Sequence, residues 1–235
     1  FGPRPMPTAP TEGSTAPRVL QHLLSLWSRL RPTGWLAAFD MDGTLIFGDA
    51  GDLVYQNLLT QIPLPLTWDA YVRLLNQSGP ITAYRRQMES LSGVPGYLIR
   101  SLSRALFPAT GPGACPPTPL RSLLHQMAAL GATCAMVSSS HQETVLAVRD
   151  HLFPEMATRI HALGVRFQGH AHILEPAPIG PGKAKLLQER FPGHHLMLAA
   201  GNSEGDLALL STIHPQGLAL WVDSDPRLFE EMRGR

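Results

Sequence analysis

A short apolar run from Trp35 to Phe39 leads directly into the turn Asp40-Met41-Asp42-Gly43-Thr44. An apolar run of this length, bounded by polar turn residues, is typical of a strand that is buried on both faces. The acidic pair then follows the carboxyl end of the strand, and its alternation puts both carboxylates on one side. The feature predicts a parallel sheet with reactive side chains at one edge.

Strands and helices alternate through the second half of the chain. We expect strands at 133–137, 160–165, 196–200 and 218–222, and helices at 119–130, 141–152, 182–190 and after Ser203. This order favours the α/β class, with a doubly wound, Rossmann-like parallel sheet. The ligand site of such a sheet lies outside the carboxyl ends of its strands.

The segment between these two parts has a helical apolar pattern from about residue 51 to residue 107. Breaks at Pro63, Pro65, Gly79-Pro80 and Gly93 divide it into about four short helices. A linker rich in Gly and Pro follows at 109–117. We therefore expect a small helical cap at 50–112, inserted into a core made of residues 18–49 and 113–235.

The first 17 residues contain five prolines together with Gly, Ser and Thr, a composition that buries too little apolar surface to fold. We expect a disordered leader at 1–17. An amphipathic helix between Val19 and Leu30 is expected to pack on the main domain, with a membrane-surface or partner role as the alternative.

Composition argues against several classes of function. Nineteen Lys and Arg against eighteen Asp and Glu give a net charge of +1 without a block of like charge, so no nucleic-acid partner is expected. The apolar stretches are far shorter than the roughly 20 residues of a membrane span, so none is expected. Cys115 and Cys134 indicate no disulfide framework, and the ten histidines form no zinc set.

Two of four polar pieces of the sequence, the Asp40 turn and Ser138, suit the chemistry of phosphoryl groups. Asp40 and Asp42 lie close enough to need a cation or a proton between them, and can act as a nucleophile and a general acid/base. Gly43 and Thr44 can present backbone amides to an anion. Ser138, after the second strand, can donate to a phosphoryl oxygen, while Ser139 or Ser140 is expected to cap the next helix.

Lys183, at the front of a helix, can offset the charge of phosphate and Asp40, although a solvated helix face explains it equally well. The loop from Gly201 to Asp206 follows another strand and carries oxygen ligands for a hard cation, for which Mg²⁺ is the natural choice. An acidic turn that merely caps the next segment is the structural alternative for the aspartate pair.

In this order, the four pieces resemble the motifs of the haloacid dehalogenase superfamily, and the helical insert resembles that of its phosphoserine-phosphatase-like branch. The resemblance covers residues 35 to about 229. It implies Asp40 as the nucleophile and a metal ligand, and Asp42 as the acid/base that also binds the metal through its backbone carbonyl. Ser138, with Ser139 beside it, and Lys183 match phosphate contacts.

The resemblance also places Asn202 and Asp206 in the metal-holding loop. Asn202 stands where the usual pattern has Asp, so the site loses a negative charge and is expected to bind Mg²⁺ less tightly. The implied function is a magnesium-dependent phosphatase that hydrolyses a small phosphorylated metabolite through an aspartyl-phosphate. The alternatives are a phosphotransferase or phosphomutase with the same intermediate, and a non-catalytic scaffold.

Candidates for substrate recognition lie near or in the insert. Asp49 matches the position of an acid that contacts a substrate amino group in the phosphoserine-phosphatase-like pattern. Arg85 and Arg86 can hold a carboxylate, although a solvated charged face explains all three residues. The aromatic residues of the insert are expected to form its core and not a cage for a quaternary amine: Tyr55, Trp68, Tyr71, Tyr84 and Tyr97.

Overall fold

The computed structural model describes Ser25 and residues 34–110, 119–169 and 172–222. The predicted leader, nearly all of the predicted helix between Val19 and Leu30, and most of the predicted linker lie outside the described residues. The elements that follow all belong to the unit formed by residues 33–235.

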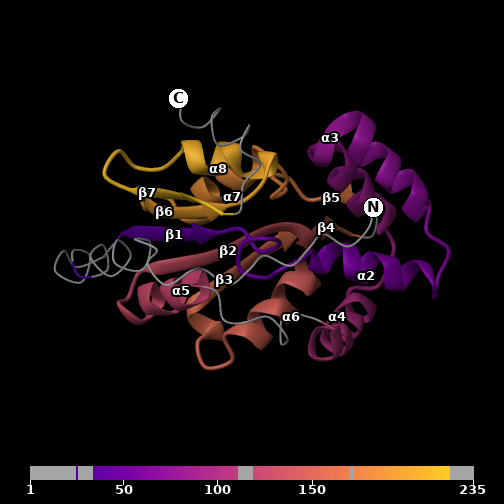
Figure 1. Ribbon diagram of the computed structural model, residues 1–235, viewed down its shortest axis with the longest axis horizontal. Helices are drawn as coiled ribbons and strands as arrows, with labels where there is room; N and C mark the ends of the chain where they lie inside the picture. Colours follow the sequence, from indigo (N-terminus) through magenta and orange to yellow (C-terminus); the bar gives the residue numbers. More distant parts are fainter. Residues whose placement is uncertain (1–24, 26–33, 111–118, 170–171, 223–235) are drawn as a thin grey trace, which may run out of the picture. The chain divides into compact units, whose positions relative to one another are not determined.

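Five parallel strands form the central sheet (Figure 1) in the order β3-β2-β1-β6-β7, which confirms the predicted fold class. Their bounds are β1 Trp35–Phe39, β2 Thr133–His141, β3 Ile160–Val165, β6 His195–Gly201 and β7 Leu218–Trp221. The chain leaves β1 on one side for β2 and β3 and later returns to its other side for β6 and β7. Strand order therefore reverses at β1, where α/β sheets place their ligand sites.

The strand register brings three chain segments together at the carboxyl end of β1. Phe39 pairs with Met136 of β2 and with Ala200 of β6. The amide of Asp40 continues the ladder by donating to the carbonyl of Ala200 over 2.9 Å. The acidic turn thus begins between the ends of β2 and β6.

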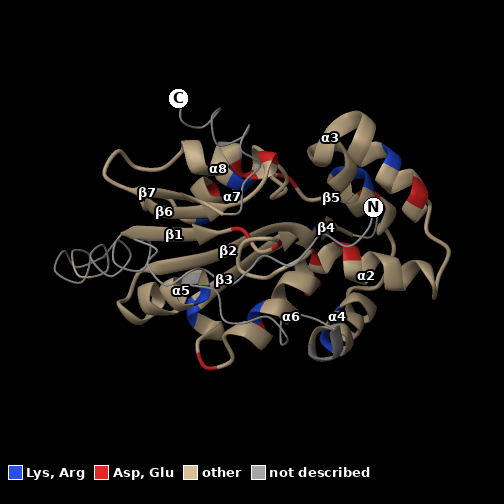
Figure 2. Ribbon diagram, viewed as in Figure 1, with Lys and Arg blue, Asp and Glu red and all other residues tan. Residues whose placement is uncertain are grey.

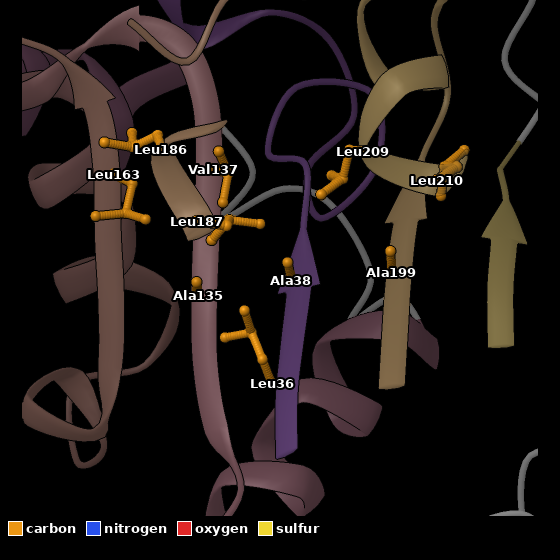
Figure 3. Close-up of a cluster of buried hydrophobic side chains, with 10 residues drawn as sticks. All are labelled: Leu36, Ala38, Ala135, Val137, Leu163, Leu186, Leu187, Ala199, Leu209 and Leu210. Carbon is orange, nitrogen blue, oxygen red and sulfur yellow. The ribbon is translucent and has the colours of Figure 1, made fainter. Parts of the chain in front are cut away.

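Helices cover both faces of the sheet. On one face, α7 (Gly182–Arg190) and α8 (Leu207–Ser211) pack leucines on small strand residues such as Ala38, Ala135 and Ala199 (Figure 3). On the other face, α5 (Pro119–Ala129) and α6 (Gln142–Leu152) contact β1, β2 and β3. Burial on both faces explains why the strands read as continuous apolar runs.

The insert consists of α2 (Ala50–Leu59), α3 (Trp68–Ser90) and α4 (Gly96–Thr110). Helix α3 continues across Gly79-Pro80, but Gly79 has φ of +78° and marks a kink at the predicted break. Val54, Tyr55 and Ile99 of the insert share one apolar cluster with Val165 and Ala177 of the rest of the chain. The division into cap and core stays a prediction.

A two-stranded antiparallel ribbon, β4 (Phe167–Gln168) and β5 (His172–Ile173), was not predicted because each strand is too short to show a pattern. Cys134 is fully buried in β2, where burial raises the pKa of its thiol to about 12, and Cys115 lies outside the described residues. Among the helices that the structure describes, none has the length and apolar character needed to cross a membrane.

Candidate active site

The turn after β1 buries Asp40, whose exposed fraction is 5 %. Gly43 has φ of +71°, a conformation that a residue with a Cβ adopts only at a cost, and its amide donates to the carbonyl of Gly48 over 3.0 Å. The hydroxyl of Thr44 donates to Asp40 Oδ2 over 3.3 Å. Gly43 and Thr44 therefore shape the turn and orient the carboxylate that was predicted to react.

Lys183 connects the ends of β1 and β6. Its Nζ donates to Asp40 Oδ1 and to Asp206 Oδ1, each over 2.6 Å, and its side chain is 3 % exposed. Burial alone lowers the pKa of Lys183, but the Asp206 and Asp40 carboxylates outweigh it and leave the pKa above its ordinary value. A charged lysine is thus held at the predicted nucleophile, and the solvated-face alternative does not describe it.

Asp42 is held by three donors. Ser138 and Ser140 donate their hydroxyls to Asp42 Oδ2 over 2.9 and 3.0 Å, and the amide of Ala50 donates to Oδ1 over 2.7 Å. Burial raises the pKa of Asp42 to about 6, although these three donors oppose the rise. The Asp42 carboxyl therefore titrates close to neutral pH, which suits a group that must both give and take a proton.

The three successive serines have different partners. Strand β2 runs four residues further than predicted, through His141, so the serines belong to the strand. Ser138 and Ser140 face Asp42, whereas Ser139 donates to the carbonyl of Pro178 over 3.1 Å. The phosphate contact expected of the Ser139 side chain stays a prediction, and its hydroxyl proton is used elsewhere.

Helix α6 is capped by His141. The Nδ1 atom of His141 accepts a hydrogen bond from the amide of Glu143 over 3.1 Å, and the His141 ring stacks on Phe167 at a centroid distance of 5.7 Å. The prediction that Ser139 or Ser140 caps this helix is wrong, because the extended strand directs both hydroxyls to other partners. Burial lowers the pKa of His141 to about 4.

Asp206 uses most of its acceptor capacity within its own turn. Its Oδ2 accepts from the amides of Asn202 and Ser203 and from the Ser203 hydroxyl over 3.0 to 3.1 Å, while Oδ1 accepts from Lys183. Each carboxylate oxygen has about two acceptor positions, so Oδ2 is saturated and Oδ1 keeps one position beside Lys183. Asp206 closes the capping box of the turn Glu204–Asp206, so these bonds favour a positioning role over direct ligation of a metal.

The residues that are free to bind a cation are oxygen donors on the two turns. In the described part of the chain, no three His, Cys, Asp or Glu side chains form a metal-binding group. Asn202 packs so closely on Gly43 that a Cβ there would lie 1.9 Å from its Nδ2, which places its amide against the acidic turn. Amide oxygen, carboxylate and backbone carbonyl suit Mg²⁺, so the donor set fits that ion.

The predicted substrate residues lie in different places in the structure. Asp49 is the N-cap of α2, where its Oδ1 accepts from the amide of Asp52 over 2.7 Å. Arg85 pairs with Glu175 over 2.8 Å, on the rim of a cavity of about 650 Å³ that Lys185 also lines. Arg86 pairs with Glu89 over 3.0 Å on the exposed side of α3. The structure thus brings Asp49, and not the arginines, to the catalytic turn.

Ser140 is the residue of the site that sequence reasoning missed as a functional contact. The available signal was the spacing of two from Ser138, which places both hydroxyls on one side of a strand. Reading that signal required knowing that the strand continues past Val137.

An α/β sheet that holds a buried carboxylate at its point of reversal, with a lysine and hydroxyls around it, describes the site of a hydrolytic enzyme. The chain belongs to the haloacid dehalogenase-like hydrolase family, whose model matches residues 37–211. No curated protein matches the sequence.

Solved structures share the fold at low identity. Phosphoserine phosphatase, captured as an analogue of its phospho-aspartyl intermediate, superimposes with a TM-score of 0.54 at 16% identity, covering 84% of this chain and 90% of its own. A hydrolase of the same family from Salmonella enterica serovar Typhi gives 0.56 at 19%, covering 94% and 76%. A Bordetella pertussis protein of unknown function gives 0.62 at 15%, covering 86% and 96%.

Proposed function

We propose that this hydrolase is a magnesium-dependent phosphatase that cleaves a small phosphomonoester through an aspartyl-phosphate on Asp40. The observation that carries the proposal is the arrangement of one lysine and two differently held aspartates. Lys183 is bonded to Asp40, while Asp42 is held apart by Ser138 and Ser140. One carboxylate is thus paired with a cation, and the other is kept near its point of titration.

In the first step, an oxygen of Asp40 attacks phosphorus and the bond from phosphorus to the ester oxygen breaks. Oδ2 suits the attack, because its hydrogen bond from Thr44 is long and leaves lone pairs free. Asp42 gives its proton to the departing oxygen, and the products are the alcohol and the Asp40 acyl phosphate. Lys183 stabilises the charge that gathers on the phosphoryl oxygens.

In the second step, the Asp42 carboxylate takes a proton from water as the water oxygen attacks phosphorus. The bond between phosphorus and Asp40 breaks, inorganic phosphate leaves, and both aspartates return to their starting states. Ser138, Ser140 and the Ala50 amide keep Asp42 in place throughout, because they bond to oxygens on both sides of its carboxyl group.

Asp40, the Asp42 backbone carbonyl and Asn202 would hold Mg²⁺. Bound there, the ion would neutralise the carboxylates and the phosphoryl group and polarise the phosphoryl oxygens. Burial raises the pKa of Asp40, and Asp206 adds to the rise while Lys183 opposes it, so the buried carboxylates lack sufficient positive charge. A divalent cation supplies that charge.

Asp40 and Lys183 are almost fully buried, so we propose that the insert moves to admit the substrate. Ion pairs tie the insert to the rest of the chain: Arg100 of α4 bonds to Glu143 of α6, and Arg85 of α3 bonds to Glu175. Closure over a bound ester would then exclude bulk water from the acyl phosphate.

The test is phosphate release from p-nitrophenyl phosphate and a panel of small phosphomonoesters, with Mg²⁺ or with chelator, by the native chain and Asp40→Asn. We expect metal-dependent release that Asp40→Asn abolishes. Release only when an alcohol or sugar acceptor is added would establish a phosphotransferase or phosphomutase. A folded chain that neither binds Mg²⁺ nor releases phosphate would establish the scaffold.

A further inference from the structure

The segment that leads into Lys183 is a buried loop, although loops usually run over the surface of a protein. It consists of residues 175–181, and we call it the lysine loop. Ala177 and Ile179 of this loop are 1 % and 4 % exposed, and both belong to the apolar cluster that the insert shares with the rest of the chain. The position of Lys183 therefore depends on what packs around the loop.

The lysine loop is folded tightly onto the first turn of α7. The amide of Gly182 donates to the carbonyl of Ile179 over 3.1 Å. The amide of Lys183 donates to the carbonyl of Gly180 over 3.0 Å. A Cβ on Gly182 would lie 1.8 Å from the carbonyl oxygen of Ala177, so the loop and the start of the helix touch backbone to backbone. Because close-packed groups transmit displacement, a shift of the loop moves the backbone of Lys183.

Ser139 of β2 holds the lysine loop from the sheet. The Ser139 hydroxyl donates to the carbonyl of Pro178 over 3.1 Å, and Pro178 is buried. A buried carbonyl that lacks a donor costs free energy, so this bond fixes the loop against the strand. The hydroxyls of Ser138 and Ser140 bind Asp42 instead. The end of β2 thus holds the acid/base through two serines and the lysine loop through the serine between them.

Ile81 of α3 holds the lysine loop from the insert. A Cβ on Gly180 would lie 2.9 to 3.4 Å from three carbons of the Ile81 side chain, so this side chain lies against the loop. Gly180 has φ of +53°, a conformation that glycine adopts without the cost that a Cβ brings. Ile81 thus occupies the space beside a residue that has no side chain, and its contact ties the loop to the insert.

Lys183 has to meet two carboxylates from one position. Its Nζ donates to Asp40 and to Asp206, each over 2.6 Å, so it must lie between the turns after β1 and β6. Figure 2 shows a basic segment on α7 and an acidic segment at the end of β1. A displaced start of α7 would lengthen at least one of the two bonds. The position of the lysine loop is therefore decisive for both ion pairs.

From these contacts we infer that Ser139 and Ile81 are positioning residues, which hold the lysine loop from the sheet and from the insert and so place Lys183 Nζ at Asp40. The inference rests on the proposed function and adds the residues that prepare its charged contact. Because Ile81 belongs to the insert, an insert that moves away releases one side of the loop. Lys183 therefore has its full effect on the phosphoryl group only when the insert is closed, which couples closure to catalysis.

The first test measures kcat and KM for p-nitrophenyl phosphate in the native chain, Ser139→Ala and Ile81→Ala, with rates expressed per folded chain. Each variant should lower kcat by roughly 10- to 100-fold, because small misplacements remote from the chemistry have effects of this size. KM should stay within about threefold, because Lys183 acts on charge that develops in the transition state. A Ser139 hydroxyl that contacted phosphate directly would instead raise KM and leave kcat unchanged.

Two further variants serve as controls. Ser139→Thr keeps the hydroxyl that donates to the loop, so kcat should stay within about twofold of the native value. Ser211→Ala also removes a hydroxyl that donates to a carbonyl, that of Ala208 over 2.9 Å, but it does so on the exposed end of α8. This second control should change neither kcat nor KM.

A second test follows Lys183 directly and needs no turnover. The chain has only two lysines, Lys183 and the exposed Lys185, so isotope-labelled lysine gives two side-chain signals in NMR spectra. Lys185→Arg identifies the signal of Lys183. Buried, hydrogen-bonded protons exchange slowly with water, so the ammonium signal of Lys183 should be protected in the native chain. It should shift or lose protection in Ser139→Ala and Ile81→Ala, and stay unchanged in Ser211→Ala.

Native kcat in both alanine variants, or an unchanged Lys183 signal in both, would overturn the inference while the phosphatase stands. A raised KM with native kcat in Ser139→Ala would make Ser139 a phosphate contact and would overturn the inference as well. If the native chain released no phosphate, the proposed function would fail, and the Lys183 signal would still decide whether the two residues place the lysine.

Discussion

The turns after β1 and after β6 each present an aspartate to the same lysine, yet the two carboxylates are in different states. Asp206 accepts four hydrogen bonds, three of which are on Oδ2, so that oxygen is saturated. Asp40 accepts from Lys183 and, over a longer distance, from Thr44. Both side chains are buried, so the difference between them lies in how many hydrogen-bond donors each carboxylate already has and not in residue type or burial.

The largest effect should come from Asp40→Asn. An amide cannot form the acyl phosphate, so phosphate release should fall by roughly a million-fold, as it does when a serine protease loses its nucleophile. The unfolding free energy should change by less than about 1.5 kcal/mol, because Lys183 keeps its bond to Asp206. A large loss of stability in urea unfolding would contradict the distinction between the two aspartates.

The main effect of Asp206→Asn should be a loss of stability. An amide must turn its N–H₂ either toward Lys183 or toward the three donors of the turn, so one side of the network is broken. We expect the unfolding free energy to fall by about 3 kcal/mol, the usual effect of breaking a buried ion pair. The measurement is urea unfolding of Asp206→Asn and Asp40→Asn side by side. Equal stability of the two variants would contradict the predicted difference between the two aspartates.

Asn202→Asp should strengthen cation binding. The change restores a carboxylate next to the acidic turn, so the Mg²⁺ concentration for half-maximal activity should fall roughly tenfold, which corresponds to 1.4 kcal/mol. Without metal, the added charge should lower the melting temperature. Ser211→Asp, on the exposed end of α8, adds the same charge away from the turn and serves as the control. An unchanged Mg²⁺ requirement would exclude the Asn202 side chain from the cation site.

The remaining effect depends on pH and concerns the cap of α6. Because burial lowers the pKa of His141 to about 4, the unfolded chain takes up a proton below its own pKa near 6.5 while the folded chain does not. The unfolding free energy therefore falls as pH decreases from 6.5 to 4, by up to about 3 kcal/mol from this residue.

His141→Asn retains a capping oxygen and removes this titration. Any advantage in unfolding free energy that the native chain has over His141→Asn near pH 6.5 should thus become smaller, or reverse, as the pH falls toward 4. Burial also raises the pKa of Asp49 and of Asp52, but both carboxyls are present in both proteins and cancel in the difference. A difference that is constant with pH would show that His141 is not buried as a neutral cap.

The parts of the fold that the sequence predicted are those encoded locally. The apolar runs gave the strands within a few residues, and Gly182–Arg190 was predicted with its observed bounds. The Asp40 turn could be predicted because its chemistry lies within five consecutive residues. The kink at Gly79-Pro80 followed from the two residues themselves.

What could not be predicted depends on which distant groups meet. The lone pairs of Asp206 are used by a lysine 23 positions away and by its own turn, and no pattern in the sequence distinguishes it from a metal ligand. Arg85 and Arg86 differ from substrate-binding arginines only in their partners, Glu175 and Glu89. The hydrogen bond from Gln87 of α3 to Asp52 of α2 likewise exists only once the two helices have packed.

Three identical serines at the end of β2 are assigned to different tasks only by their position along the strand. The pairing of β2 with β3 shifts register between Val137 and His141, so a bulge lies at this point. One residue inserted before Ser138 would exchange the inward and outward hydroxyls without changing composition. Exchange of Ser for Thr should therefore be tolerated here more readily than any change in length. The spacing along the strand is what places the hydroxyls of Ser138 and Ser140 at Asp42.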